Sequence, residues 1–430
     1  MIKSRTSPAI YALIAEGFLM RIAFGIIAFT LPLYGRHLGL SLAEAGLLVA
    51  LTDVVKVALK PLMGWISDRV GLKRALVTAL GLRSLVSFLL TLAMAPWHLY
   101  AIRALHGVST SVRDPAINAL IAEHGDEKAI ASTFAWYFTA KSLAGSLGKA
   151  AGGALLTLTA SNFSLVFLIT WAFSSLTLPV VMLLVPGARR KREASLDAEV
   201  KRDSDTADEP EGPGGRHSLR RKVIAVSGLG FLISVTNSLI GIYPILATEY
   251  AGMTEAQAGA VYLASAVVAL VAGPVFGWLA DRFGRKPTIA ARSVANAGSS
   301  LLYLFIPNWV GFTTGKVMDD AGRAGFRPAW GALKADVSRS DRSQRARLMG
   351  IMDVGDDAGD MVGPVAGGLL WDLWGITGLM GTRIVLAIAT EVYGVLVAWR
   401  VHKDPAPQRV LQRGRAGAER PPPVEQHPPN

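Results

Sequence analysis

The chain has 430 residues, of which 51% are hydrophobic and only 18% charged, whereas an ordinary soluble domain is about one quarter charged. Its net charge is +12 and its mean hydropathy is +0.38. It contains no cysteine, which excludes a disulfide framework, a thiolate metal site and a thiol nucleophile. Basic residues lie in short loops and in the tail, as in membrane proteins, so we expect a lipid bilayer and no nucleic acid as partner.

Apolar residues occur in runs of about 20, the length that crosses a bilayer core. These runs are predicted to be helices, because hydrocarbon leaves no partner for unpaired backbone groups. The first run is too long for a signal-peptide core and is interpreted as the first span. The twelve predicted spans are residues 9–33, 42–63, 75–95, 97–122, 129–157, 163–186, 222–247, 256–280, 288–306, 309–336, 346–372 and 379–400.

Two segments are too polar to bury a core and are predicted to be disordered, namely a linker at 187–221 and a tail at 403–430. They leave a six-helix half at 1–186 and a second at 222–402. Lysine and arginine gather in one set of alternate loops, which places both termini and the linker in the cytoplasm. We therefore expect a multi-pass protein of a bacterial inner membrane.

A short stretch of the first half returns in the second. Gly64-Trp-Ile-Ser-Asp68-Arg69-Val-Gly71-Leu-Lys73-Arg74 recurs 213 residues later as Gly277-Trp-Leu-Ala-Asp281-Arg282-Phe-Gly284-Arg285-Lys286-Pro287. The fourth and tenth spans align at the same offset, and the fifth and eleventh align at 215. A repeat of this period predicts two homologous helical bundles with the same orientation.

These features resemble the major facilitator superfamily, whose marker is Gly-x-x-x-Asp-Arg-x-Gly-Arg-(Arg/Lys) between the second and third spans. The resemblance covers about residues 9–400, although Leu72 replaces a usual arginine of the marker. It implies an all-α membrane fold, with twelve transmembrane helices as two parallel six-helix repeats and alternating access by rocking of the halves. The marker implies a cytoplasmic gate, formed by Gly64, Asp68, Arg69, Gly71, Lys73, Gly277, Asp281, Arg282, Gly284, Arg285 and Lys286.

The eleventh span carries four carboxylates at i, i+3, i+4 and i+7, which share one helix face: Asp353, Asp356, Asp357 and Asp360. Such charges are costly inside a membrane unless they are neutralised. One interpretation is a gate that pairs this aspartate stripe across the halves with Lys56 and Lys60 of the second span. A second is a proton or metal site on the same four residues, since carboxylates suit ions such as Fe²⁺, Mn²⁺ or Mg²⁺.

Two further residues belong to the proposed pairing between halves. Asp53 shares a helix face with Lys56 and Lys60, and Lys141 of the fifth span aligns with Asp356 at the 215 offset. The repeat thus places opposite charges at matching positions.

In the family the first, fourth, seventh and tenth spans line a central cavity. The resemblance therefore makes substrate or proton candidates of Glu16, Arg103, Arg113, Asp114, Asp320 and Arg323. Glu16 is the preferred proton carrier, beside Asp114 or Asp320, and the alternative is structural salt bridging within one half. Arg113 and Asp114 are adjacent, so they are expected to point in different directions around the helix and not to form one compact site.

The sequence contains no nucleotide-binding loop and no evident hydrolase constellation, so we expect neither enzymatic activity nor a cofactor. Transport would then draw on an ion or substrate gradient. The aspartate stripe favours a secondary transporter of an inorganic cation. The segments 111–116 and 325–330 resemble the magnetosome-associated branch of the family, which implies iron transport for biomineralisation in a magnetosome membrane. Two alternatives stay open: a proton-coupled exporter of drugs or small metabolites, and a non-transporting membrane scaffold.

Overall fold

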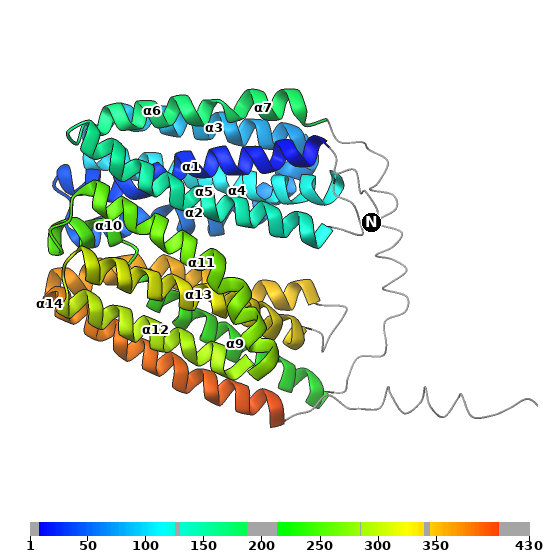
Figure 1. Ribbon diagram of the computed structural model, residues 1–430. Coiled ribbons are helices and arrows are strands. Elements are labelled where there is room, and N and C mark those ends of the chain that lie inside the picture. Colours follow the sequence, from blue (N-terminus) through cyan, green and yellow to red (C-terminus); the bar gives the residue numbers. More distant parts are fainter. Residues whose placement is uncertain (1–7, 125–129, 187–212, 284, 339–344, 404–430) are drawn as a thin grey trace, which may run out of the picture.

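The computed structural model describes residues 8–124, 130–186, 213–283, 285–338 and 345–403, and no strand occurs in these ranges (Figure 1). The first half comprises α1 (Pro8–His37), α2 (Leu42–Val70), α3 (Leu72–Thr91), α4 (Pro96–His124), α5 (Ile130–Leu158), α6 (Phe163–Ser175) and α7 (Thr177–Leu184). The second comprises α9 (Pro213–Ser238), α10 (Tyr243–Ile245), the π-helical turn η1 (Leu246–Tyr250), α11 (Glu255–Phe283), α12 (Arg285–Phe305), α13 (Trp309–Ser338) and α14 (Arg345–Lys403). Figure 1 shows the two sets of helices side by side.

The predicted spans fall on these helices, with local differences. Helix α9 begins at Pro213, inside the predicted linker, because the fixed backbone angle of proline suits the first turn of a helix. Helix α14 includes the last two predicted spans, which are separated at the non-helical Gly375 (φ 65°). Within the described ranges, the stretches long and apolar enough to cross a bilayer are Pro8–His37, Leu72–Thr91, Phe163–Leu184, Leu219–Tyr250 and Leu348–Val397. The number of twelve spans therefore stays a prediction.

Glycines set the closest helix crossing inside the second half. Gly355, Gly359, Gly363 and Gly367 recur every fourth residue along α14, and a Cβ built at any of them would lie 2.0–2.5 Å from an atom of α9 or of Leu239 directly after it. Rows of small residues let membrane helices approach closely and gain van der Waals contact. This row therefore fixes the rotation of α14 against α9, and with it the direction of the aspartates between the glycines.

The two halves meet at one end of the molecule through the same contact made twice. A Cβ at Gly368 of α14 would lie 2.1 Å from the Leu42 carbonyl of α2, and a Cβ at Gly153 of α5 would lie 2.2 Å from the Glu255 carbonyl of α11. Gly153 and Gly368 are equivalent residues of the repeat, as are Leu42 and Glu255. The duplication thus produces two matching crossings, α2 with α14 and α5 with α11.

The helix starts at these crossings are capped in the same symmetric way. The Ala43 amide of α2 donates to Asp372 Oδ2 (2.8 Å), and the Ala256 amide of α11 donates to Thr157 Oγ1 (3.0 Å). In each case a side chain of the opposite half satisfies a free amide in the first turn of a helix. We call this end, which also holds α10, the distal end; it lies opposite the start of α9 and the end of α7 (Figure 1).

Apolar side chains from both halves seal the distal end. Leu42 and Ala45 of α2 form one buried cluster with Ile242 and Ile245 of the second half. Arg36, at the end of α1, also donates two hydrogen bonds to the Glu249 carboxylate (2.8 and 3.0 Å). The molecule is therefore closed at this end by two symmetric crossings, an apolar seal and an ion pair.

Candidate functional site

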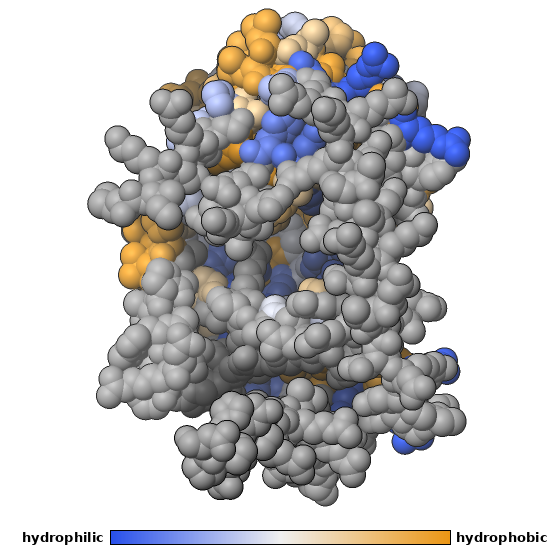
Figure 2. All heavy atoms as spheres, turned by 90° about the vertical axis from the view of Figure 1, so that its right-hand side faces the viewer, coloured by the Kyte–Doolittle hydropathy of each residue, from blue (hydrophilic) through white to orange (hydrophobic). Residues whose placement is uncertain are grey.

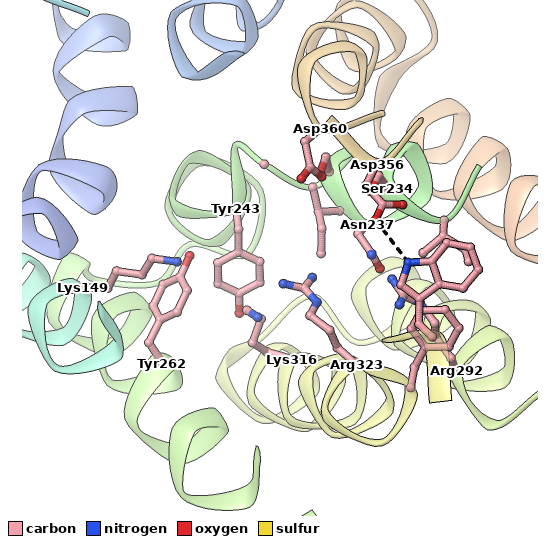
Figure 3. Close-up of a pocket in the computed structure, with 16 residues that line it drawn as sticks. Lys149, Ser234, Asn237, Tyr243, Tyr262, Arg292, Lys316, Arg323, Asp356 and Asp360 are labelled. Atoms are coloured by element: carbon pink, nitrogen blue, oxygen red, sulfur yellow. Dashed lines mark hydrogen bonds between the residues drawn. The ribbon is translucent and has the colours of Figure 1, made fainter. Parts of the chain in front are cut away.

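A cavity of about 380 Å³ lies against the seam between the halves (Figure 3). Helices α9, α10, α11, α13 and α14 supply most of its lining, and Lys149 of α5 is the residue that the first half contributes. Seen from the end opposite the distal end, hydrophilic side chains lie deep in a hollow of the molecule (Figure 2). The volume falls in the range of about 300–1,000 Å³ that is typical of sites for small molecules.

One end of the cavity carries cationic side chains. Lys316 of α13 forms an ion pair with Asp320, which also accepts a hydrogen bond from Ser265 of α11. Arg323 lies one turn further along α13, at 3.6 Å from Asp319 and 3.9 Å from Asp320. Of the predicted candidates, Arg323 lines the cavity and Asp320 supports its wall.

The opposite end carries part of the predicted aspartate stripe. Asp356 accepts from Trp330 Nε1 (3.2 Å) and from Lys334 Nζ (2.9 Å), and Asp353 accepts from the same lysine (2.5 Å). Asp360 accepts from the Ser238 hydroxyl (2.7 Å).

This arrangement gives no support to the metal hypothesis for Asp353, Asp356, Asp357 and Asp360, which stays a prediction. In the part of the chain that the structure describes, no three carboxylate or histidine side chains come close enough to hold a metal ion. The glycine row turns α14 so that its aspartates reach different neighbours, with Asp356 directed to α13 and Asp360 to α9.

Most residues of the proposed pairing across the halves have partners within their own half, and the pairing stays a prediction. Lys56 forms an ion pair with Asp53 on its own helix (2.5 Å), and Asp353 and Asp356 pair with Lys334 of their own half. Asp357 does interact electrostatically with Lys56 across the seam. Asp53 lies one helical turn from Lys56, so pairing with it needs little ordering of the lysine side chain. It therefore competes with an aspartate of the other half for the same lysine.

The other two residues of that pairing are placed differently. Lys141 lies 5.8 Å from the ring centre of Tyr137, in its own half. The side chain of Lys60 lies outside the described residues, so its role stays a prediction.

In the first half, Arg113 joins the predicted candidates Glu16 and Asp114 into one cluster. Its Nε and Nη2 donate to Glu16 (2.9 and 2.6 Å), and its Nη1 donates to Asp114 (3.2 Å). The expectation that Arg113 and Asp114 form no compact site was wrong, because the long arginine side chain bridges both carboxylates. Glu16 is fully buried, whereas the Asp114 side chain is 38% exposed.

Arg103 has a structural environment. Its Nε donates to the Leu48 carbonyl (3.0 Å) and its Nη2 to the Val49 carbonyl (2.9 Å), both on α2. The Thr52 hydroxyl returns a hydrogen bond to the Arg103 carbonyl (3.2 Å). These bonds fasten α4 to α2, and Arg103 does not line the cavity.

The predicted cytoplasmic gate is described only in part. Gly71 has φ 96°, which favours glycine at the turn between α2 and α3, and Lys73 donates to the Met182 carbonyl of α7 (3.0 Å). Arg69 also belongs to the described part. The side chains of Asp68, Asp281, Arg282, Arg285 and Lys286, and the environments of Gly64, Gly277 and Gly284, lie outside it. The latch between halves therefore stays a prediction.

Sequence reasoning missed several residues that line the cavity or stabilise the second half. Lys149, Tyr243 and Tyr262 line the cavity. Arg383 is fully buried on α14 and donates to Asp319 (2.6 Å) and to the Thr236 carbonyl (3.1 Å). Lys149 and Arg383 could have been found as charged residues inside predicted spans. Tyr243 and Tyr262 are uncharged, so nothing in the sequence marked them as cavity residues.

Comparisons with known proteins match most of the chain. A family model described as Major Facilitator Superfamily matches residues 14–243 and 224–426. Multidrug resistance protein 2 of Bacillus subtilis is 23% identical over 368 residues, which cover 84% of this chain and 88% of that protein. The bacillibactin exporter of Bacillus subtilis is 25% identical over 156 residues, so the match spans 35% of this chain and only 39% of the exporter.

A solved structure has the same fold. The bacterial homologue of the human lysosomal transporter Spinster, in an inward-facing and unoccupied conformation, matches with a TM-score of 0.71 at 15% identity, covering 94% of this chain and 100% of that one. The match to the family model accounts for the repeat, the helical bundles and the seam between them. The magnetosome branch has no comparable support. The chain belongs to the Major Facilitator Superfamily, and it is a multi-pass membrane transporter rather than an enzyme.

Proposed function

We propose that this transporter exports small organic molecules from the cytoplasm by alternating access. The observation that carries the proposal is the cavity against the seam, combined with the closed distal end. A cavity of this size suits an organic solute, whereas a bare metal ion needs a tight set of oxygen ligands. The likeness to a multidrug resistance protein over most of both chains supports the same reading.

The conformation agrees with a state that loads its substrate from the cytoplasm. The distal end is closed, and the positive-inside pattern puts the opposite end in the cytoplasm. Rocking of one half against the other would separate the two crossings and open the distal end. A substrate bound at the seam would then leave on the far side of the membrane.

We assign proton coupling to the cluster of Glu16, Arg113 and Asp114. Asp114 is its partly exposed member and can exchange a proton with water, whereas Glu16 is enclosed by its bonds to Arg113. Protonation of Asp114 would remove one of the two carboxylates that neutralise Arg113. Protonation would therefore alter the ion pair that joins α1 to α4, since Glu16 lies on α1 and Arg113 on α4.

The arrangement of charges favours an organic exporter over the inorganic-cation carrier. Asp353 and Asp356 share Lys334 as a partner, and Asp360 accepts a hydrogen bond from Ser238, so the aspartates are held apart by different neighbours. A non-transporting scaffold would not need a polar cavity at the seam. Both alternatives make distinct predictions in one flux experiment.

The experiment uses the full chain in proteoliposomes with and without a pH gradient. The solutes are a panel of fluorescent drugs, Fe²⁺ and Mn²⁺. Because the chain contains no cysteine, Arg36→Cys with Glu249→Cys introduces the only two thiols, which a cleavable bifunctional reagent can link across the distal end. We expect gradient-driven flux of an organic solute that stops on linking and returns on cleavage. Flux of metal ions alone would support the cation carrier, and the absence of any flux would support the scaffold.

A further inference from the structure

The cationic end of the cavity has hydrogen-bond donors that the protein does not use. Lys149 Nζ forms no hydrogen bond or ion pair with any of the described residues, and it lies 4.4 Å from the ring centre of Tyr262. Arg323 meets Asp319 and Asp320 only at 3.6 and 3.9 Å, and its buried Nε has no hydrogen-bond partner there. A buried charged donor without an acceptor is costly, which applies to Arg323 Nε, and the half-buried Lys149 ammonium has no anionic partner beside it, so both groups invite an anionic ligand.

These donors come from opposite halves of the transporter. Lys149 belongs to α5 and Arg323 to α13, and Figure 3 shows both side chains directed toward the space around Tyr243. Lys316, between them, is already paired with Asp320. An anion placed here would gain contacts with both halves at once, so its affinity would depend on how the halves are tilted.

Aromatic rings line the space next to the cations. The ring centres of Tyr243 and Tyr262 lie 5.6 Å apart in an edge-to-face arrangement, and Phe326 and Trp330 lie at the far end of the cavity. Flat aromatic faces suit a ligand that itself contains rings. At the far end, Asp356 Oδ1 is buried without a hydrogen-bond partner in the described part, so it can accept from a hydroxyl or amide of the ligand.

We propose that the cavity binds aromatic organic anions, whose carboxylate or other anionic group lies between Lys149 and Arg323 while the rings lie against Tyr243 and Tyr262. This inference rests on the proposed export function and names its substrate class. It also sets a direction of selectivity: a cation of the same ring system meets Lys149, Lys316 and Arg323 and is disfavoured by like-charge repulsion.

Two dyes that share a xanthene ring system and differ in charge test the proposal, namely anionic carboxyfluorescein and cationic rhodamine 6G. Binding is measured by fluorescence anisotropy on the full chain in lipid nanodiscs. We expect carboxyfluorescein to bind more tightly, and Lys149→Gln or Arg323→Gln to weaken it by about tenfold, the usual size of one charged hydrogen bond. Lys149→Arg keeps the charge and should keep the affinity.

Lys222→Gln is the matched control, because the same change is made on α9 outside the cavity lining. Thermal unfolding of each variant separates a lost contact from a lost fold. The proposal is overturned if rhodamine 6G binds more tightly, if carboxyfluorescein does not bind, or if Lys149→Gln and Arg323→Gln both bind it like the unaltered chain. Any of these results would leave the export function standing as long as the flux panel still shows an organic solute driven by the gradient.

Discussion

Arg36 pairs with the residue that occupies its own equivalent position in the second repeat, Glu249, 213 positions later. Two equivalent residues can touch only next to the axis that relates the halves, so this pair marks the axis at the distal end. Their side chains are 31% and 38% exposed, and an exposed pair of this kind contributes about 0–1 kcal/mol. The pair is therefore a contact that rocking can break at little cost.

Charge reversal at this pair should bias the transporter toward opening at the distal end. Arg36→Glu places two carboxylates on the axis, and we expect the closed state to lose about 1 kcal/mol, a shift of up to about fivefold in population. Ile245→Cys, buried in the apolar seal, reports opening by its rate of thiol labelling. Adding Glu249→Arg should restore the slow rate, and equal rates in all three proteins would show that the pair does not act on the gate.

The glycines of the two crossings should be required for closure. Gly153→Val brings a side chain to within 2.2 Å of the Glu255 carbonyl, and Gly368→Val does the same at Leu42. Overpacking of this kind costs about 1–3 kcal/mol, so either change should leave the distal end open and raise labelling of Ile245→Cys.

Gly381→Val on α14 is the control for these valines, because no atom lies within 4 Å of a Cβ at that position. Gly381→Val makes the same change in helix propensity as the other two substitutions, but at a position that does not lie at a helix crossing. If Gly381→Val raised labelling as much as the other two, close packing at the crossings would not be the cause.

The buried pair of Arg383 and Asp319 should hold the second half together. Both side chains are fully buried, so Asp319→Asn leaves an uncompensated charge and should lower the free energy of unfolding by about 3–5 kcal/mol. Thermal unfolding in detergent measures this loss. Arg36→Ala, at an exposed pair, should change it by less than about 1 kcal/mol. If Asp319→Asn unfolded at the same temperature as the unaltered chain, the stabilising role of this pair would be contradicted.

Substitutions of Asp114 and Glu16 should have different effects, the first on proton coupling and the second on the stability of the first half. Asp114→Asn removes the exposed carboxylate, and we expect it to abolish gradient-driven transport while substrate counterflow continues. Glu16→Gln takes the buried partner from Arg113 and should instead destabilise the first half, since a buried charge is left unpaired. Counterflow and unfolding measured on both variants test this. Gradient-driven transport that persists in Asp114→Asn would exclude Asp114 as the proton carrier.

The order of helices and the duplication could be read from the sequence because they depend on local pattern. Apolar runs of membrane-spanning length and the recurrence of Gly64–Arg74 at Gly277–Pro287 led to two helical bundles in one superfamily. The candidates Glu16, Arg113, Asp114, Asp320 and Arg323 were found because charge inside an apolar run is visible in the residues themselves.

The partners of those charges depended on the rotation and tilt of whole helices. The sequence placed four aspartates on one face, but the glycine row of α14 directs Asp356 to α13 and Asp360 to α9. Helical spacing predicted that Arg113 and Asp114 point in different directions, yet the long arginine side chain reaches the Asp114 carboxylate. Composition and repeat pattern determined the fold by themselves, because burial and backbone satisfaction act within each segment. Only the tertiary structure decided which charges are paired and which, like Lys149, face the cavity, because side-chain contacts between helices depend on packing that no single helix encodes.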